Sequence, residues 1–272
     1  MSHDEPADRR AETPPHALHG MNPCGRFSDR VRDYVRYRPD YPAAAFDHML
    51  AGLATGPGCV VADVGAGTGI ATRALAARGV RVLAVEPNAE MRAAAEPHPL
   101  VEWRDGSAEH TGLPDASVQL VLCAQAFHWF RAPEALAEFQ RVLAPGGRLA
   151  LLWNTRSADD AFTAGYTAAI RAVSGGHAAE MRPFDAGVVS AEGRFEPATL
   201  ARFDHAQRTD LTGLVGRATS ASYVPKQGEP FERLQGLLAA LHERHRDADG
   251  FVTLRYVTEL WCARRCEPGE RA

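Results

Sequence analysis

The stretch CVVADVGAGTGIATRALA at residues 59–76 decides the fold, because an apolar run leads through three glycines into a helical pattern. Gly65, Gly67 and Gly69 stand at alternate positions directly after that run. Glycine adopts positive φ easily and has no Cβ, so a turn of this composition lets a ligand approach the backbone. A strand, a glycine turn and a helix over 68–78 are typical of the ligand-binding edge of a parallel sheet.

Strand and helix patterns continue to alternate after this turn. The sequence predicts strands at 59–64, 80–86, 100–104, 117–123 and 148–154, with helices between them at 68–78, 89–96 and 132–144. Parallel strands need a crossover connection, which is usually a helix, so this order predicts an α/β fold with a Rossmann-like, mostly parallel sheet and helices on both faces. Two later runs, at 198–207 and 250–261, look like further strands and bring the expected number to seven.

The two ends of the chain differ from this core. Residues 1–25 are rich in proline, alanine and charge and show no apolar periodicity, so we expect a disordered tail. Helical spacing returns before the first strand and again near the end of the chain, where apolar residues form one stripe. We therefore expect a single domain over 26–272, in which 59–154 is the ligand-binding core and 26–54 and 208–249 form a helical lid.

Composition and charge exclude several classes of function. The net charge of −4 is too small to indicate a nucleic-acid partner or an anionic membrane surface. No apolar run approaches the ~20 residues that span a bilayer, and the first residues lack the apolar core of a secretion signal. The five cysteines are scattered and form neither a disulfide framework nor a metal-binding spacing. We expect a cytoplasmic protein, a monomer or a homodimer, without a metal.

The spacing of the glycines separates two classes of ligand. The dinucleotide-binding fingerprint is G-x-G-x-x-G, which would place its third glycine at position 70, where this chain has Ile70. Here the spacing is G-x-G-x-G, and Asp63 precedes the turn. A carboxylate beside the turn repels a pyrophosphate and suits a ligand that bears an ammonium group. A nicotinamide-dependent oxidoreductase remains an alternative.

Four motifs in order resemble those of the class I S-adenosylmethionine-dependent methyltransferases. VADVGAGTG (61–69) is similar to the glycine motif of that family, and VEPN (85–88) places Glu86 where an acidic residue accepts both ribose hydroxyls. DGSAEHTGLPDASVQLVLC (105–123) resembles the stretch that reaches the adenine, and VLAPGGRLAL (142–151) matches a late Pro-Gly-Gly turn. The resemblance implies an antiparallel last strand and S-adenosyl-L-methionine as the cofactor.

A narrower resemblance lies outside these motifs. FSDRVRDYVRYRPDYP (27–42) and AQAFHWF (124–130) resemble the methyltransferase type 11 and trans-aconitate methyltransferase-like branch, whose members act on small molecules, although Val31 replaces the usual alanine. The resemblance implies that Tyr34 and Arg38 lie over the cofactor. A guanidinium fork suits a carboxylate, so Arg38 is a candidate partner for the methionyl carboxylate.

Carried over position by position, the resemblance implies a set of cofactor-binding residues. They are Tyr34, Arg38, Asp63, Gly65, Ala66, Gly67, Thr68, Gly69, Glu86, Pro87, Asn88, Met91, Ser107, Ala108, Glu109, Ala124 and Gln125. Ser107 stands where the family often has aspartate, which weakens the expected contact with the adenine amine. Met91 packs either on the adenine or in the core.

Histidine and aromatic residues follow the fourth and fifth strands at the same edge. His128 is the candidate catalytic residue, because an imidazole that titrates near pH 6–7 can take a proton from an acceptor. It can equally shape the pocket wall. Phe127, Trp129 and Trp153 are candidate substrate contacts, or core residues. Asn154 binds substrate, or caps a helix that starts near Ala158.

The expected function is methyl transfer to a small-molecule acceptor. O-methylation of a carboxylate or hydroxyl is favoured, and the high content of alanine, arginine and glycine suggests bacterial secondary metabolism. N- or C-methylation of a small molecule stays open, as does a non-catalytic cofactor-binding protein on the same fold.

Overall fold

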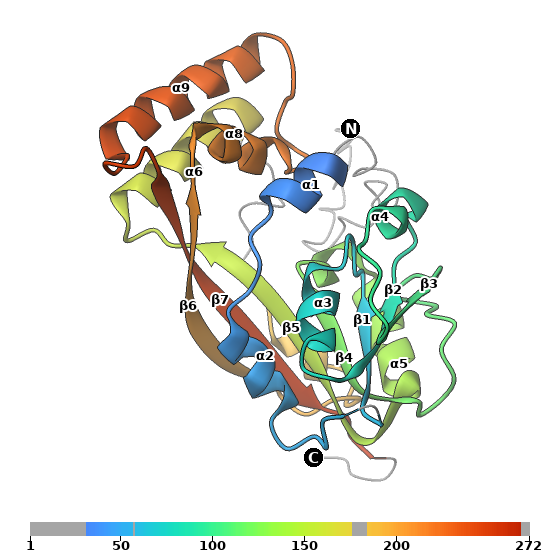
Figure 1. The fold of residues 1–272 in the computed structure, drawn as a ribbon. Helices are drawn as coiled ribbons and strands as arrows, with labels where there is room; N and C mark the ends of the chain where they lie inside the picture. The colour runs from blue at the N-terminus through green and yellow to red at the C-terminus, as the bar shows by residue number, and fades with distance from the viewer. Residues whose placement is uncertain (1–30, 57, 176–183, 268–272) are drawn as a thin grey trace, which may run out of the picture.

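A seven-stranded sheet runs through the computed structural model, which describes residues 31–56, 58–175 and 184–267 (Figure 1). The expected tail at 1–25 lies outside the described residues. The strand order is β3-β2-β1-β4-β5-β7-β6. In chain order the strands are β1 (Val60–Val64), β2 (Arg81–Val85), β3 (Val101–Arg104), β4 (Val118–Ala124), β5 (Leu143–Arg156), β6 (Thr199–Thr209) and β7 (Val252–Arg264).

The first five strands are parallel, and the last two form an antiparallel edge. β1 pairs with β2 and β4 in parallel, as do β2 with β3 and β4 with β5. β7 lies antiparallel between β5 and β6. The predicted Rossmann-like, mostly parallel sheet with an antiparallel last strand is therefore confirmed. Because the strand order reverses between β1 and β4, the carboxyl ends of these two strands flank the place where an open α/β sheet binds its ligand.

Helices cover both faces of this sheet and one of its ends. In chain order they are α1 (Val31–Tyr37), α2 (Ala43–Leu50), α3 (Ile70–Ala76), α4 (Ala89–Ala93), the short 3₁₀ helix η3 (Phe127–Trp129), α5 (Ala132–Val142), α6 (Ala161–Ser174), α7 (Gly187–Ser190), α8 (Leu211–Thr219) and α9 (Glu229–His245). None of the described helices is long and apolar enough to span a membrane.

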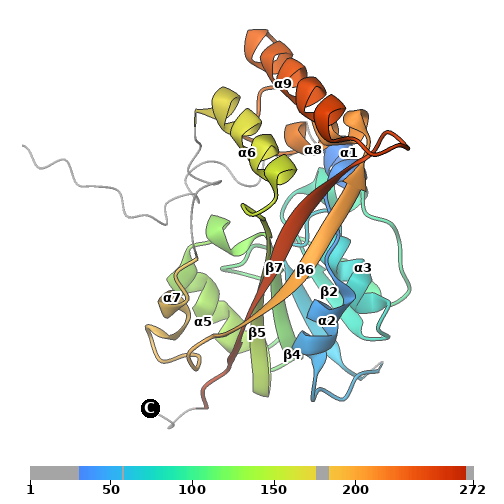
Figure 2. The same ribbon diagram turned by 90° about the vertical axis from the view of Figure 1, so that its left-hand side faces the viewer.

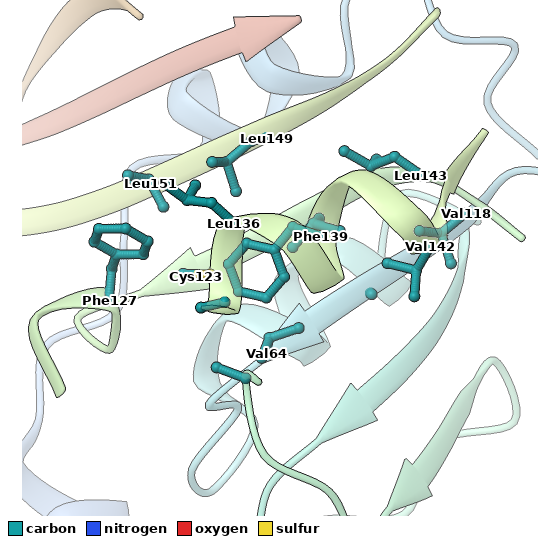
Figure 3. Packing of buried hydrophobic residues seen from close by; sticks show 14 of the residues in the cluster. Val64, Val118, Cys123, Phe127, Leu136, Phe139, Val142, Leu143, Leu149 and Leu151 are labelled. Atoms are coloured by element: carbon teal, nitrogen blue, oxygen red, sulfur yellow. The ribbon is translucent and has the colours of Figure 1, made fainter. Parts of the chain in front are cut away.

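The continuous apolar strands are explained by burial on both faces. Along β4, Leu120 and Leu122 pack in one hydrophobic cluster with α2 and α3, while Val121 and Cys123 pack in another with α5. Figure 2 shows α2 and α3 on one side of the sheet and α5 and α7 on the other. Figure 3 shows the second cluster, in which Phe139 of α5 lies against the strands. A strand buried on both faces has no polar side, so its sequence is apolar throughout.

A third hydrophobic cluster lies outside these two layers and joins the lid helices. Its buried members come from α6, α8, α9 and the start of β7, and include Tyr166, Leu214, Leu238 and Tyr256. Figures 1 and 2 show α6, α8 and α9 gathered at the end of the sheet toward which β5 runs, with α1 beside α8. Helices are present in both segments that we expected to form the lid, but α2 packs on a face of the sheet with α3, and α6 is a helix that we did not predict.

The segment after α1 is tied to the lid and to the sheet through its backbone. The side chain of Gln207 in β6 donates to the carbonyl of Tyr37 at 2.9 Å, and the Asn154 amide of β5 donates to the carbonyl of Asp40 at 2.8 Å. The ring of Tyr37 lies directly against Gly216 of α8, where a Cβ would meet Cδ2 of that ring at 2.2 Å. Glycine at this position therefore lets α1 and α8 approach each other.

We predict that Gly216→Ala lowers the free energy of unfolding by ~1–3 kcal/mol, because the added methyl group overpacks the contact with Tyr37. Alanine is otherwise more favourable than glycine in a helix by ~1 kcal/mol, so helix propensity alone predicts a gain in stability. Gly236→Ala in α9 is the matched control, since its Cβ meets nothing within 4 Å. The control should be stabilised in urea denaturation. If both variants are stabilised to the same extent, the contact between α1 and α8 does not form.

Candidate functional site

The three glycines form a left-handed turn between β1 and α3. Their φ angles are +71° at Gly65, +58° at Gly67 and +81° at Gly69, a region that other residues rarely adopt. The N–H groups of Gly65 and Ala66 donate to the carbonyl of Val85 at 2.9 and 3.2 Å, which ties the turn to the end of β2. The turn thus lies at the carboxyl ends of β1 and β2.

Two of these glycines are also required by neighbouring side chains. A Cβ on Gly65 would lie 2.7 Å from Cβ of Ala126, and one on Gly69 would lie 3.1 Å from the ring of Trp103. The segment after β4 therefore packs directly on the glycine turn. Ligand access was the reason predicted from the sequence, and close packing of protein on protein is a second one.

Asp63 is a fully buried carboxyl at the end of β1. Its Oδ2 accepts a hydrogen bond from the hydroxyl of Thr72 in α3 at 2.6 Å, and its Oδ1 has no partner among the described residues. Burial, and to a smaller extent the nearby Glu86 carboxylate, raises the pKa of Asp63 to about 7, although the hydrogen bonds from Thr72 oppose the rise. Thr72 has no place in the glycine motif, so sequence reasoning did not identify it.

Glu86 and Asn88 organise the turn that follows β2. The carboxylate of Glu86 accepts the N–H of Gly67 and the N–H of Asn88, each at 2.9 Å, and burial raises the pKa of Glu86. Asn88 Oδ1 caps α4 by accepting the N–H groups of Glu90 and Met91, so part of this side chain serves the fold. Glu86 thereby links the glycine turn to the loop after β2, and Pro87 lies between the two.

The loop after β3 closes on itself. Ser107 and His110 exchange backbone hydrogen bonds at 3.1 and 3.3 Å, and Ala108 is buried. The carboxylate of Glu109 accepts the N–H of Arg131 at 2.9 Å, which holds the loop against the start of α5. Met91 of α4 is 3% exposed and thus lies in the buried interior.

The chain makes a strained turn after β4. Gln125 has a φ of +56°, follows Ala124 at the end of the strand, and donates its N–H to the carbonyl of Leu152 at 2.8 Å. Its side-chain amide donates to the carbonyl of Asn154 at 3.2 Å. The turn is followed by η3, which contains His128.

His128 is half-buried and lies with its ring centroid 5.1 Å from that of Trp129. Burial, and to a smaller extent the charge of Arg38, lowers the pKa of His128 to about 4. The expected titration near 6–7 is therefore wrong, because the imidazole is neutral over the physiological range. Arg38 itself donates to the carbonyl of Ser220 at 3.2 Å, and the side chain of Tyr34 lies outside the described residues.

Most of the candidate substrate contacts are engaged with protein. Phe127 is 4% exposed and packs in the cluster with α5, and the Trp153 ring lies 4.7 Å from that of Phe184. The Asn154 amide accepts from the Thr258 hydroxyl at 2.6 Å while it donates to Asp40. Asn154 as a helix cap is wrong, because β5 continues to Arg156 and Asp160 caps α6.

Metal chemistry finds no support in this region. Within residues 31–56, 58–175 and 184–267, no three His, Cys, Asp or Glu side chains gather to hold a metal ion.

The sheet order, the antiparallel edge and the glycine turn after β1 define the class I methyltransferase fold. Residues 62–151 match the family model described as a methyltransferase domain. An uncharacterized methyltransferase of Mycobacterium tuberculosis is 46% identical over 134 residues, which are 48% of this chain and 52% of that protein. An uncharacterized methyltransferase-like protein of Schizosaccharomyces pombe is 42% identical over 132 residues, with coverage of 48% and 52%. The matched region thus spans about half the length of these curated relatives.

A solved structure extends the likeness beyond the matched region. A putative type II methyltransferase from Anaeromyxobacter dehalogenans superposes with a TM-score of 0.62 at 26% identity, covering 84% of this chain and 97% of its own. The chain therefore has the class I methyltransferase fold, and residues 62–151 are the part that matches the methyltransferase domain model.

Asp63 should leave a signature in the pH dependence of stability. An acid whose pKa is raised on folding holds its proton more tightly in the folded state, so the free energy of unfolding falls between about pH 4 and pH 7 and is level above that. Asp63→Asn removes this dependence. The unfolding free energy of Asp63→Asn minus that of wild type should therefore rise by ~4 kcal/mol from about pH 4 to about pH 7. Urea denaturation at several pH values measures it, and parallel profiles would show that Asp63 titrates normally.

Proposed function

We propose that this chain transfers a methyl group from S-adenosyl-L-methionine to a small-molecule acceptor. The observation that carries the proposal is Asp63, whose buried Oδ1 has no partner among the described residues. A buried carboxylate is stable only when a hydrogen-bond donor or a cation meets it. The ammonium group of a methionyl moiety supplies both, whereas a pyrophosphate supplies neither.

The other residues around the glycine turn fit the same cofactor. Glu86 keeps lone pairs for the ribose hydroxyls, because its two backbone hydrogen bonds use one lone pair on each oxygen. Arg38 is our candidate for the methionyl carboxylate, and Met91 with the loop at 107–109 is our candidate for the adenine. The positive φ values of the glycines support a backbone that a ligand can approach closely.

The sulfonium of the bound cofactor supplies an activated methyl group with a good leaving group. The chain's own task is then to align the acceptor and to exclude water. The helices α1, α6, α8 and α9 support this task, because they gather beyond the carboxyl ends of the parallel strands. A lid of this size suits a small acceptor with an apolar part.

We propose O-methylation, and an acceptor that arrives as an anion fits His128 best. A base with a pKa of about 4 is too weak to remove a proton efficiently from a hydroxyl group. A carboxylate needs no base. C-methylation remains the second candidate, because a ubiquinone/menaquinone biosynthesis C-methyltransferase of Rubrivivax gelatinosus is 42% identical over 95 residues, 34% of this chain and 38% of that protein.

Isothermal titration tests the proposal. The protein should bind S-adenosylhomocysteine and should not bind NADH, and a labelled methyl donor should transfer its methyl group to members of an acceptor screen. Binding of NADH in place of S-adenosylhomocysteine would favour the oxidoreductase. Cofactor binding without transfer to any acceptor would favour a binding protein.

We expect Glu86→Ala to weaken S-adenosylhomocysteine binding by ~1.5–3 kcal/mol, as charge-assisted hydrogen bonds are lost. The alanine variant also releases the N–H groups of Gly67 and Asn88. Glu86→Gln keeps an acceptor oxygen and should therefore lose less. Glu90→Ala, an exposed carboxyl of α4, is the control and should bind normally. Unchanged binding by Glu86→Ala would remove Glu86 from the site.

His128→Asn should change acceptor affinity more than the rate of the chemical step. Single-turnover rates at saturating acceptor isolate that step from product release. We expect rates within about tenfold of wild type and no rise of the wild-type rate between about pH 6 and pH 7, since His128 is already neutral there. His48→Asn on the exposed face of α2 is the control. A fall of ~100-fold or more at unchanged cofactor affinity would instead identify His128 as a general base.

A further inference from the structure

The last turn of α8 contains a buried guanidinium that no carboxylate of the described residues pairs with. Arg217 is 8% exposed, and its Nε is buried without a hydrogen-bond partner among the described residues. No described carboxylate pairs with it, and the groups that raise the pKa of Arg217 are all tyrosines. Arginine is rarely buried without a paired acid.

Tyrosine hydroxyls surround this guanidinium. Tyr166, Tyr223 and Tyr256 interact with Arg217, and the Tyr166 hydroxyl is buried with no partner in the described part of the chain. Burial raises the pKa of Tyr166, so this hydroxyl stays protonated and can donate a hydrogen bond. The guanidinium of Arg156 lies 5.6 Å from the centre of the Tyr166 ring and adds positive charge.

The buried guanidinium and its tyrosines lower the free energy of unfolding of the protein without ligand. Removing a cation from water without a partner is unfavourable, and replacement of buried charges by apolar groups often stabilises a protein. The carboxyl end of α8 offsets part of this cost, because a helix C-terminus favours a cation. A donor-rich, positively charged and unsatisfied site of this kind is matched by an anion with several acceptor oxygens.

Hydrogen bonds at the end of α8 connect Arg217 to Arg38. The Ser220 hydroxyl donates to the carbonyl of Arg217 at 2.7 Å, and the Ser220 carbonyl accepts from Arg38 at 3.2 Å. The charge of Arg38 acts in turn on His128. The residues that flank His128 pack on Gly65. Arg217 is thus joined, through its backbone carbonyl and Ser220, to Arg38, our candidate for the methionyl carboxylate.

We propose that Arg217, with the hydroxyl of Tyr166, binds an anionic group of the acceptor, a carboxylate or a phosphate. The proposal rests on the proposed methyltransferase function and narrows its acceptors to anions. A guanidinium fork can meet two oxygens of either group at once, and the Tyr166 hydroxyl can donate to a remaining lone pair. The apolar cluster of α6, α8 and α9 surrounds the same region and suits the body of the acceptor.

Matched pairs of probes test the charge requirement. Isothermal titration in the presence of S-adenosylhomocysteine compares cinnamate with cinnamamide and phenyl phosphate with phenol, for wild type, Arg217→Met, Arg217→Lys and the control Arg233→Met on the exposed face of α9. Wild type and control should prefer at least one anion to its neutral partner by about tenfold or more, and the preferred pair identifies carboxylate or phosphate. Arg217→Met should lose the preference, and Arg217→Lys should retain part of it because it keeps the charge without the fork.

Two further readouts separate this site from a structural role. Arg217→Met should bind S-adenosylhomocysteine as wild type does, and its melting temperature should equal or exceed that of wild type. Absence of S-adenosylhomocysteine binding by wild type contradicts the proposed function itself. With that binding intact, the anion site is overturned if no anion is preferred to its neutral partner, or if Arg217→Met keeps the preference. It is also overturned if Arg217→Met unfolds and Arg217→Lys, folded as wild type, shows no loss of the preference.

Discussion

The buried carboxyl of Asp63 is the constraint on which the site depends. It sits at the end of β1, where parallel strands on either side and helix α3 above exclude water, and the Thr72 hydroxyl satisfies only one of its oxygens. Burial raises the pKa of Asp63 to about 7, so the free protein can hold the group as a neutral acid. A cation bound at Oδ1 favours the ionised carboxylate of Asp63 instead. Ligand binding and ionisation of Asp63 are therefore linked.

Around this carboxyl the fold separates two kinds of recognition. The glycine turn, Glu86 and the loop after β3 are built on the rigid sheet and present backbone and acidic groups. The helical end of the molecule presents the opposite charge, with Arg38 bound to the carbonyl of Ser220 and Arg217 among tyrosines. The acidic side would then favour the ammonium group of a cofactor, and the arginines would favour an anionic group. Like charges close together cost free energy, so this arrangement opposes binding in the wrong orientation.

The sheet and the cofactor turn could be predicted because their signals are local. Leu120 to Cys123 are apolar at consecutive positions because β4 is buried on both faces, and the three glycines mark a turn that needs positive φ.

The uses of Asn154 and Phe127 could not be predicted, since they depend on partners far along the chain, Thr258 for the amide and Phe184 for the ring. The approach of Tyr37 to Gly216 is likewise invisible in either segment alone. Helix α6 is different, because Asp160 followed by Phe162, Tyr166, Ala169 and Ile170 is a recognisable capped helix that we did not predict.

Carbon-13 NMR of the Asp63 carboxyl, assigned by comparison with Asp63→Asn, tests the central claim most directly. The account predicts a pKa of about 7 in the free protein and a fall of ~2 units or more when S-adenosylhomocysteine is bound, because an adjacent ammonium favours the ionised form. A group that titrates near its ordinary value of about 4 in the free protein, or whose pKa does not move on binding, would contradict it.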